Sequence, residues 1–419
     1  MSFETVSVVG LGYIGLPTAA MFASRKKKVV GVDVNQHAVD TINQGKIHII
    51  EPELDMIVNV AVKEGYLKAV TAPEAADAFL IAVPTPFLPC QEGEVPAPDL
   101  SYIKAASKAI APVLKKGDLV ILESTSPVGA TEQMADWLAE ARSDLTFPKT
   151  HGESADINIS HCPERVLPGH VVRELVENDR VVGGLTPKCS KRSVELYQTF
   201  VQGECVVTNA RTAEMAKLTE NSSRDVQIAF ANELSVICDK LDINVWELIA
   251  LANRHPRVNI LQPGPGVGGH CIAVDPWFIV SKSPTDARII HAARIVNDSK
   301  PDWVVDKTKM AIADFLQENT DKTAKDIIIA CYGLAFKPDI DDLRESPALD
   351  ITKKLSQVHS GRVVAVEPNI ASLALASVDL IEVDEAFAIA DIHVLLVDHK
   401  QFVMLKPSLK YLVDSKGIW

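Results

Sequence analysis

Residues 6–15 read VSVVGLGYIG, a short apolar run followed by three glycines in the spacing G-x-G-x-x-G. The run predicts a buried strand over residues 6–9, and the residues after the last glycine predict a helix. Strand, glycine turn and helix in this order are typical of a dinucleotide-binding unit, in which the backbone approaches a pyrophosphate closely. Cofactor contacts are therefore expected from Gly10, Gly12, Tyr13, Ile14 and Gly15.

A carboxylate follows the second predicted strand of this unit. Residues 29–32 read as a strand, and Asp33 stands directly after it. A carboxylate at this position accepts hydrogen bonds from the adenosine ribose hydroxyls. The next residues are Val34 and Asn35, and no Arg is present to receive a 2′-phosphate. The sequence therefore favours NAD over NADP.

Two further predicted strands, residues 79–83 and 119–122, precede loops that contain Thr85 and Thr125. Ligands of open α/β sheets lie at the carboxyl ends of the strands, so both threonines are expected to face the cofactor. Ordinary turn capping is the alternative role for each threonine. It has more weight for Thr85 than for Thr125.

The overall composition is typical of a globular protein with more than one domain. The chain has 419 residues, of which 47% are hydrophobic and 23% charged. It contains neither an apolar run long enough to span a membrane nor a basic leader, so a cytoplasmic location is expected. The formal charge of −13 argues against nucleic-acid binding. The seven cysteines form no C-x-x-C pair or Cys/His cluster, so neither a metal site nor a disulfide framework is expected.

A long helix without Pro or Gly is predicted over residues 212–241, and a shorter one over 245–253. A helix of that length is expected to bridge domains or to form a subunit interface. Lys217 and Asn221 stand four residues apart on it and therefore share a face. Together they could bind a substrate hydroxyl and stabilise an oxyanion.

The last hundred residues predict a second Rossmann-like unit, with strands over 327–330, 363–366 and 394–397. Its first turn has Gly333 but lacks the second and third glycines of the fingerprint, and it carries Lys337 instead. We interpret this turn as a site for a nucleotide diphosphate rather than a dinucleotide.

Cys271 ends the stretch GPGVGGHC, residues 264–271, which is too rich in Gly and Pro for a packed helix or strand. A thiolate can add to an aldehyde and so make a second hydride available, which suggests oxidation past the aldehyde. Asp275 could hold water or Lys217, and Glu164 could activate a hydrolytic water. His270 is expected to point away from the thiol, because neighbours in an extended segment face opposite sides.

Taken together, these motifs resemble the UDP-glucose/GDP-mannose dehydrogenase family along essentially the whole chain. The resemblance also covers residues 83–86, 124–129 and 344–347. It implies two Rossmann-like doubly wound domains joined by a central helical domain. The expected boundaries are residues 1–200 for NAD binding, 201–305 for the helical domain with the cysteine loop and dimer interface, and 306–419 for UDP-sugar binding.

The resemblance also assigns roles to individual residues. It implies a four-electron oxidation of a nucleotide sugar's C6 alcohol, with Cys271 as the nucleophile passing through a thiohemiacetal and a thioester. Lys217 and Asn221 would handle the C6 oxygen, while Asp275 and Thr125 would support the water and Lys217, and Glu164 would assist hydrolysis. Substrate contacts are implied for Glu164, Arg165, Lys217, Asn221, Gly268, Lys337 and Arg344. Arg257 would reach the site of a neighbouring subunit in a homodimer.

Two departures bear on the substrate. Val274 and Pro168 replace a lysine and an acid of the UDP-glucose branch, and the Cys271 motif resembles the branch that acts on UDP-N-acetylhexosamines. The expected substrate is UDP-N-acetyl-D-mannosamine, for the synthesis of surface polysaccharide. UDP-N-acetylglucosamine remains open, because these residues do not determine the configuration at C2.

Three other classes are weighed. None of the six tyrosines has Lys four residues later, which excludes short-chain epimerases and dehydratases. A two-electron β-hydroxyacid dehydrogenase would share the first domain and the Lys/Asn pair, but it requires neither Cys271 nor a C-terminal nucleotide domain. A non-catalytic sensor would bind ligand without turnover, and the intact Cys271, Lys217 and Asp275 argue against it.

Overall fold

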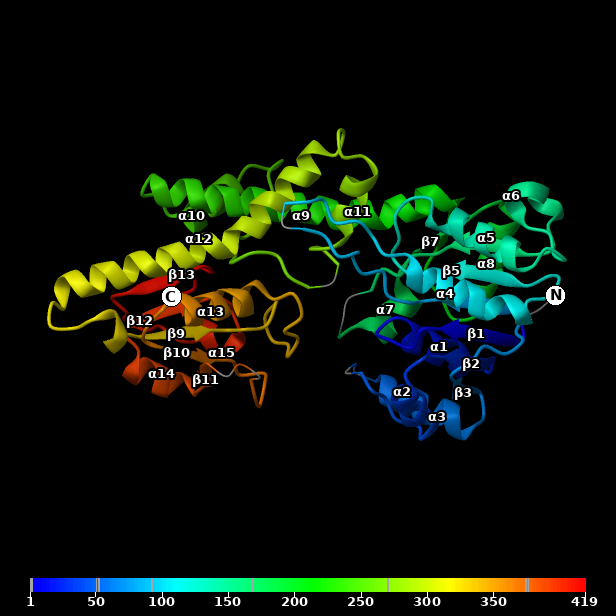
Figure 1. The fold of residues 1–419 in the computed structure, drawn as a ribbon, viewed down its shortest axis with the longest axis horizontal. Helices are drawn as coiled ribbons and strands as arrows, with labels where there is room; N and C mark the ends of the chain where they lie inside the picture. The colour runs from blue at the N-terminus through cyan, green and yellow to red at the C-terminus, as the bar shows by residue number, and fades with distance from the viewer. Residues whose placement is uncertain are drawn as a thin grey trace. The chain divides into compact units, whose positions relative to one another are not determined.

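The computed structural model describes residues 3–49, 51, 53–91, 93–166, 169–269, 271–373, 375 and 377–419. It forms two compact units (Figure 1). The first contains Met1–Thr219 and Trp277–Lys282, and the second contains Glu220–Pro276 and Ser283–Trp419.

The first unit is built on an eight-stranded sheet with the order β3-β2-β1-β4-β5-β6-β7-β8. Its first six strands follow the doubly wound order 3-2-1-4-5-6 of a dinucleotide-binding fold. Neighbouring strands are parallel except for β6 and β7. The strands are β1 (Thr5–Val9), β2 (Lys28–Val32), β3 (Leu67–Val70), β4 (Ala78–Ile81), β5 (Leu119–Leu122), β6 (Asn158–His161), β7 (Arg180–Gly184) and β8 (Cys205–Asn209).

Helices cover both faces of this sheet, because successive strand residues point to opposite sides. Val6 and Val8 enter one apolar core, whereas Val9 enters the other. The helices of this part of the chain are α1 (Gly15–Ser24), α2 (Gln36–Asn43), α3 (Leu54–Lys63), α4 (Ser101–Ile110), α5 (Ala130–Ala141), α6 (Pro148–His151), α7 (Val171–Glu177) and α8 (Pro187–Tyr197).

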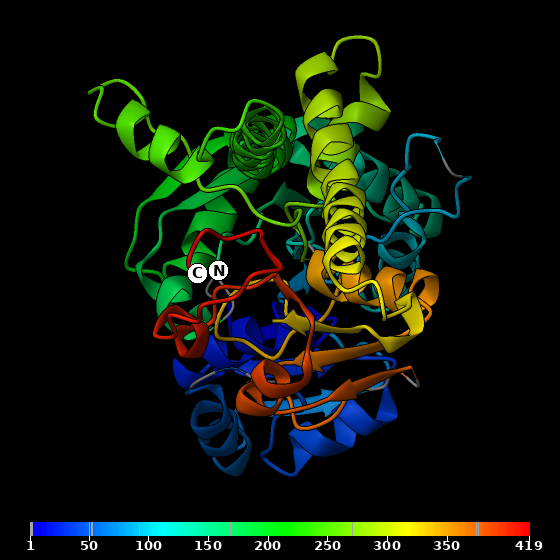
Figure 2. The same cartoon turned by 90° about the vertical axis from the view of Figure 1, so that its left-hand side faces the viewer.

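The second unit contains a parallel five-stranded sheet with the order β11-β10-β9-β12-β13. The strands are β9 (Ile328–Tyr332), β10 (Arg362–Val366), β11 (Val378–Leu380), β12 (Ile392–Leu395) and β13 (Leu412–Asp414). Its remaining helices are α13 (Pro347–Val358), α14 (Val383–Ile389) and α15 (Lys400–Val403). Helices α12 (Arg288–Glu318) and α13 pack on one face of the sheet, while α14 and α15 pack on the other (Figures 1 and 2).

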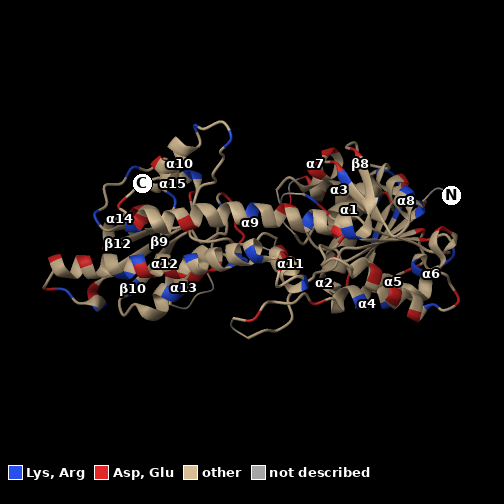
Figure 3. Cartoon of the chain, turned by 90° about the horizontal axis from the view of Figure 1, so that it is seen from above, with Lys and Arg blue, Asp and Glu red and all other residues tan. Residues whose placement is uncertain are grey.

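Two long helices dominate the middle of the chain. The predicted long helix is α9 (Ala210–Lys240), which begins in the first unit and ends in the second. It is followed by α10 (Val245–Ala252), α11 (Asp275–Lys282) and α12 (Arg288–Glu318). Helix α12 is as long as α9, yet the sequence analysis does not predict it, and Pro301 lies inside it. Both helices carry charges of both signs (Figure 3).

The predicted fold class is confirmed: the chain is α/β, with two Rossmann-like units and a long central helix. Among the described residues, no helix is both long and apolar enough to cross a membrane. The same residues contain no group of three or more His, Cys, Asp and Glu side chains suited to a metal ion.

Candidate active site

The turn between β1 and α1 has the geometry that close approach of a ligand requires. Gly10 has φ +91°, and a Cβ there would lie 2.5 Å from the carbonyl oxygen of Ala82. A Cβ on Gly15 would lie 1.7 Å from the carbonyl oxygen of Gly10. A Cβ on Gly12 would meet nothing within 4 Å, so this glycine leaves open space for a phosphate. The first helical residues have no side-chain cap, which leaves backbone N–H groups for an anion.

Asp33 is fixed at the end of β2. Its Oδ2 accepts the N–H of Leu11 at 2.8 Å, and its Oδ1 accepts the N–H of Asn35 at 2.9 Å. These bonds tie the carboxylate to the glycine turn, and Asp33 stays partly exposed. Tyr13 is exposed and Ile14 half-buried in the same turn. The residues present therefore fit NAD, with its pyrophosphate at the turn and its ribose at Asp33.

Thr85 and Thr125 meet in the loops that follow β4 and β5. The Thr85 hydroxyl donates to the carbonyl oxygen of Thr125 at 2.7 Å, and the Ser124 hydroxyl donates to that of Val83 at the same distance. The hydroxyl of Thr85 therefore joins the two loops, which differs from the capping of its own turn. The loops themselves still lie at the carboxyl end of the sheet.

Glu214 fixes the start of α9 to the loop after β5. Its carboxylate accepts the N–H of Gly129 at 2.7 Å, the N–H of Thr131 at 2.8 Å and the Thr131 hydroxyl at 2.6 Å. Lys217 follows one turn later and is half-buried. Glu214 therefore determines where the predicted lysine stands. Sequence reasoning missed it, because an acid in a helical pattern is usually a surface residue.

Asn221 and Asp275 form the first direct contact between predicted catalytic residues. Asn221 Nδ2 donates to Asp275 Oδ2 at 2.5 Å. The N–H groups of Val274 and Asp275 both donate to the carbonyl oxygen of Cys271, at 3.2 and 2.9 Å. Cys271 thus sits in a tight turn that leads into α11, one turn from the Asp275 carboxylate. Its side chain is exposed.

The glycines before Cys271 are required by close packing within the second unit. A Cβ on Gly268 would lie 2.3 Å from the carbonyl oxygen of Glu345, and one on Gly269 would lie 2.9 Å from the ring of Phe336. The cysteine loop therefore rests on the segment that carries Lys337 and Arg344. His270 and Pro168, which entered the sequence argument, lie outside the described residues.

The first turn of the second Rossmann-like unit is held by the carboxylate of Glu367, which is less accessible than Asp33 in the first unit. Glu367 Oε2 accepts the N–H groups of Leu334 and Ala335 at 2.7 and 3.1 Å, as Asp33 does in the first unit. However, Glu367 is buried and is also bonded to His399 Nε2 at 2.9 Å. Burial alone would raise the pKa of Glu367, but the His399 ring and the backbone N–H groups hold it below its usual range. This carboxylate is not available to a ribose, in keeping with a nucleotide-diphosphate site.

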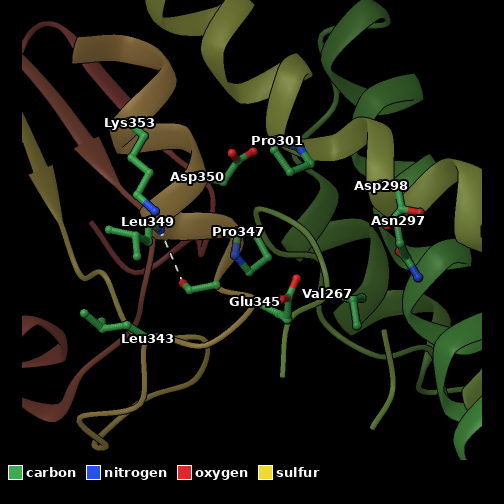
Figure 4. A pocket seen from close by; sticks show the side chains of 11 residues that line it. Val267, Asn297, Asp298, Pro301, Leu343, Glu345, Pro347, Leu349, Asp350 and Lys353 are labelled. Carbon is green, nitrogen blue, oxygen red and sulfur yellow. Dashed lines mark hydrogen bonds between the residues drawn. The ribbon is translucent and has the colours of Figure 1, made fainter. Parts of the chain in front are cut away.

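The two predicted cations of this segment differ in exposure. Lys337 is half-buried, and Arg344 is exposed with its Nη2 at 2.6 Å from Asp342 Oδ2. A cavity of about 340 Å³ is lined by Leu343 and Glu345, the two sequence neighbours of Arg344. Val267 of the cysteine loop, Glu345 and the beginning of α13 line it (Figure 4). Arg257 is exposed after α10, and its N–H donates to His255 Nδ1 at 3.3 Å.

Glu164 belongs to a buried cluster of charges in the first unit. Its Oε2 lies 2.8 Å from Arg180 Nη2, an ion pair without hydrogen-bond geometry, and its Oε1 accepts the N–H of Arg165. The side chain of Arg165 donates to the carbonyl oxygen of Asp179 at 3.2 Å. Sequence reasoning missed Arg180. It is the first residue of β7 and belongs to no recognisable motif.

A second carboxyl group, that of Glu123, shares this cluster. Tyr197 donates its hydroxyl to Glu123 Oε1 at 2.6 Å, and the guanidinium of Arg180 lies 4.5 Å from the centre of the Tyr197 ring. Complete burial raises the pKa of Glu123 to about 7, an effect that the charge of Arg180 only partly offsets. One guanidinium thus serves two carboxyl groups, so near neutral pH Glu123 carries a proton part of the time.

Comparison with known proteins agrees with this geometry. Residues 4–201 match the NAD binding domain of the UDP-glucose/GDP-mannose dehydrogenase family, residues 211–299 its central domain, and residues 330–419 its UDP binding domain. The chain belongs to this family. It is therefore an NAD-dependent nucleotide-sugar dehydrogenase.

Curated relatives cover the whole chain. A UDP-N-acetyl-D-mannosamine dehydrogenase from Yersinia pestis is 67% identical, and one from Escherichia coli is 64% identical, each over 100% of both chains. An NDP-N-acetyl-D-galactosaminuronic acid dehydrogenase from Ralstonia nicotianae is 62% identical over 100% of this chain and 97% of its own.

Solved structures show the same fold. The UDP-D-ManNAc dehydrogenase of Pyrococcus horikoshii is 37% identical with a TM-score of 0.85, over 99% of this chain and 96% of its own. The UDP-N-acetyl-mannosamine dehydrogenase of Staphylococcus aureus is 42% identical with a TM-score of 0.83, over 99% of this chain and 95% of its own.

Proposed function

We propose that the protein oxidises the C6 alcohol of UDP-N-acetyl-D-mannosamine to the uronate through an adduct on Cys271. The observation that carries this proposal is the exposed thiol in a turn beside the Asn221–Asp275 pair. The proposed substrate is the one named for the relatives that are 67% and 64% identical over 100% of both chains, whereas the relative at 62% identity is named for N-acetyl-D-galactosaminuronic acid.

Each of the chain's own groups has a defined task in this reaction. NAD, which the glycine turn and Asp33 would hold, would supply a two-electron acceptor, so a four-electron oxidation would consume two molecules for each sugar. Lys217 and Asn221 hold the C6 oxygen, and loss of its proton and the first hydride gives the aldehyde. The Cys271 thiolate then adds to the aldehyde carbon and forms the alkoxide of a thiohemiacetal. The remaining C6 hydrogen leaves this alkoxide as the second hydride, which gives the thioester. Glu164 takes a proton from the water that cleaves the thioester, which releases the carboxylate and the thiol.

The nucleotide end of the substrate would be held in the second unit. Lys337 and Arg344 are the cations that would meet the pyrophosphate, with Gly268 and Arg165 as further contacts. The matches of the three family domains support the boundaries 1–200, 201–305 and 306–419.

The protein would act as a homodimer, with Arg257 reaching the partner's site. Apolar side chains exposed on α9 and near α10 support this proposal; they are Phe230, Ile237, Leu241, Ile243 and Leu251. Apolar patches of this kind are typical of subunit interfaces. The expected location is the cytoplasm, where NAD is available and free thiols such as those of this chain stay reduced.

Counting NADH against a panel of UDP-sugars tests the proposal. Two NADH per UDP-N-acetyl-D-mannosamine are expected, with slower turnover of the N-acetylglucosamine and N-acetylgalactosamine isomers. One NADH per sugar would instead indicate a two-electron β-hydroxyacid-type reaction. Turnover of UDP-glucose alone would overturn the substrate assignment.

A further inference from the structure

A second cavity in the C-terminal unit, of about 280 Å³, contains none of the residues assigned above to catalysis or to cofactor and substrate binding. Helices α9, α10 and α12 and strand β13 enclose it. Its lining residues are Ser235, Asp239, Ile243, Val245, Trp246, Pro263, Lys300, Trp303, Lys307 and residues 412–415. Two tryptophans and several aliphatic side chains make most of its wall apolar.

Lys300 is the unusual member of this cavity. It is only 3% exposed, and its Nζ donates to Ser235 Oγ at 2.5 Å and lies 3.5 Å from the centre of the Trp303 ring. None of the ion pairs recorded among the described residues includes it. Burial lowers the pKa of Lys300 to about 7, and the nearby charge of Asp239 offsets this only in part. A buried cation without an ion-pair partner is costly, so an anion bound beside Lys300 would lower that cost.

The carboxylates and hydroxyls that line the cavity each have a partner in the protein. Asp239 is paired with Lys307 at 2.8 Å. Asp414 accepts the backbone N–H groups of Lys416, Gly417 and Trp419, at 2.7, 2.7 and 3.0 Å. The hydroxyls of Ser235 and Ser415 donate to backbone carbonyl groups at 2.6 and 2.8 Å.

The unused polar groups are therefore donors. The indole N–H of Trp246 is buried and has no hydrogen-bond partner, and Lys300 has protons to spare. Buried donors without partners are rare in folded proteins and call for an acceptor. One cation, one N–H donor and flat apolar walls match a singly charged, planar acid better than a phosphate, which carries more charge and no apolar surface.

We propose that this cavity binds a small carboxylic acid with a flat apolar body, its carboxylate facing Lys300 and Trp246. The site adjoins the start of the cysteine loop. Pro263 lines the cavity, and the N–H of Gly264 donates to Oδ1 of Asn232 at 2.9 Å, while the carbonyl oxygen of Asn232 accepts the Ser235 hydroxyl. A ligand here would touch the residues that hold the base of that loop.

Benzoate and its uncharged analogue benzamide test the proposal by titration calorimetry on the full-length protein, without NAD or sugar. One benzoate per chain is expected, and benzamide should bind at least about tenfold more weakly because it cannot pair with Lys300. Lys300→Met should weaken benzoate by about tenfold or more. Trp246→Phe, which keeps a ring but loses the N–H, should weaken it severalfold. The matched control is Lys309→Met, an exposed lysine of the same helix paired with Asp306, which should leave affinity unchanged.

The affinity should also fall as the pH rises through about 7, since Lys300 then loses its proton. The other charged groups of the cavity are Asp239, Lys307 and Asp414, and each is already bonded. Absence of binding, equal binding of benzamide, or displacement of benzoate by UDP would each overturn the proposal. If Lys300→Met fails to fold, the comparison of benzoate with benzamide and the affinity of Trp246→Phe still test the proposal.

Discussion

At the scale of single residues, the proposed chemistry depends on one exposed sulfur. Six of the seven cysteines stand outside the motif, and four cysteines, Cys162, Cys189, Cys238 and Cys331, are buried. Burial raises the pKa of Cys162 and of Cys331 to about 12, so these thiols remain protonated and unreactive. Reactivity is therefore expected where the thiol is accessible.

We predict that Cys271→Ser keeps NAD and UDP-sugar binding but lowers uronate formation by roughly 10³-fold or more, because a hydroxyl is a poor nucleophile at neutral pH. Measurement of uronate by mass spectrometry and of binding by calorimetry checks this. Cys90→Ser removes another exposed thiol and is the control, which should stay active. Full activity of Cys271→Ser would disprove the covalent route.

Glu123 predicts a pH dependence of stability. Its pKa rises from 4.5 to about 7 on folding, mainly through burial. Below about pH 4.5 the carboxyl group is protonated in both the folded and the unfolded chain. Between about pH 4.5 and 7 only the unfolded chain releases the proton, so the free energy of unfolding falls as the pH rises, by up to about 3 kcal/mol.

Glu123→Gln cannot ionise, so this part of the pH dependence should disappear. The urea midpoint of the wild type should fall relative to that of the variant between about pH 5 and pH 8. Glu153→Gln, an exposed carboxylate of the same unit, serves as the control. Parallel pH profiles of wild type and Glu123→Gln would show that the buried carboxyl does not titrate in this range.

At the scale of elements, the glycines of the β1–α1 turn differ in role. Some are needed for folding, and one leaves space for a ligand. Gly15→Ala places a methyl group against the carbonyl oxygen of Gly10 and should destabilise the first unit. Gly12→Ala meets no protein atom and should fold normally, yet its methyl group should weaken NAD binding. Thermal melting and NAD titration of both variants distinguish these effects. Equal NAD affinity of Gly12→Ala and wild type would place the pyrophosphate elsewhere.

The elements that the sequence predicts well are those with a strong local pattern. The apolar runs of β1, β2 and β5 and the uninterrupted helix α9 lie within two residues of their predicted bounds. Helix α12 has no such apolar pattern, because its buried face carries the polar side chains of Arg294, Asn297 and Lys300, and Pro301 lies inside the helix. Packing on α13 and the second sheet holds it. The short strands β6, β7 and β8 are likewise not predicted, because polar residues and glycines interrupt their apolar runs.

The candidate site shows the same division. The motif residues Cys271, Asn221 and Asp275 could be found from spacing and family resemblance. Arg180, Glu123 and Glu214 could not, because their importance comes from partners between 16 and 85 residues away in the sequence. Buried charges are recognised from their surroundings in the fold and not from local sequence.

At the scale of the whole molecule, the proposed dimer predicts that two inactive variants restore activity when they are mixed. Mixing Arg257→Ala with Cys271→Ser chains in denaturant and refolding them gives heterodimers. If Arg257 acts in the partner's site, each heterodimer has one intact site, and the mixture should recover about a quarter of wild-type activity. Each variant refolded alone should stay inactive. No recovery in the mixture would place Arg257 in the site of its own chain.

The fit of Gly268 and Gly269 against the segment around Glu345 and Phe336 limits how this protein can diversify. Neither position has space for even one added carbon. New sugar preferences therefore have to arise at other positions, for example at the half-buried Val274 in the turn after Cys271. Directed evolution that leaves the two glycines untouched should explore more functional variants than a library that randomises the whole loop.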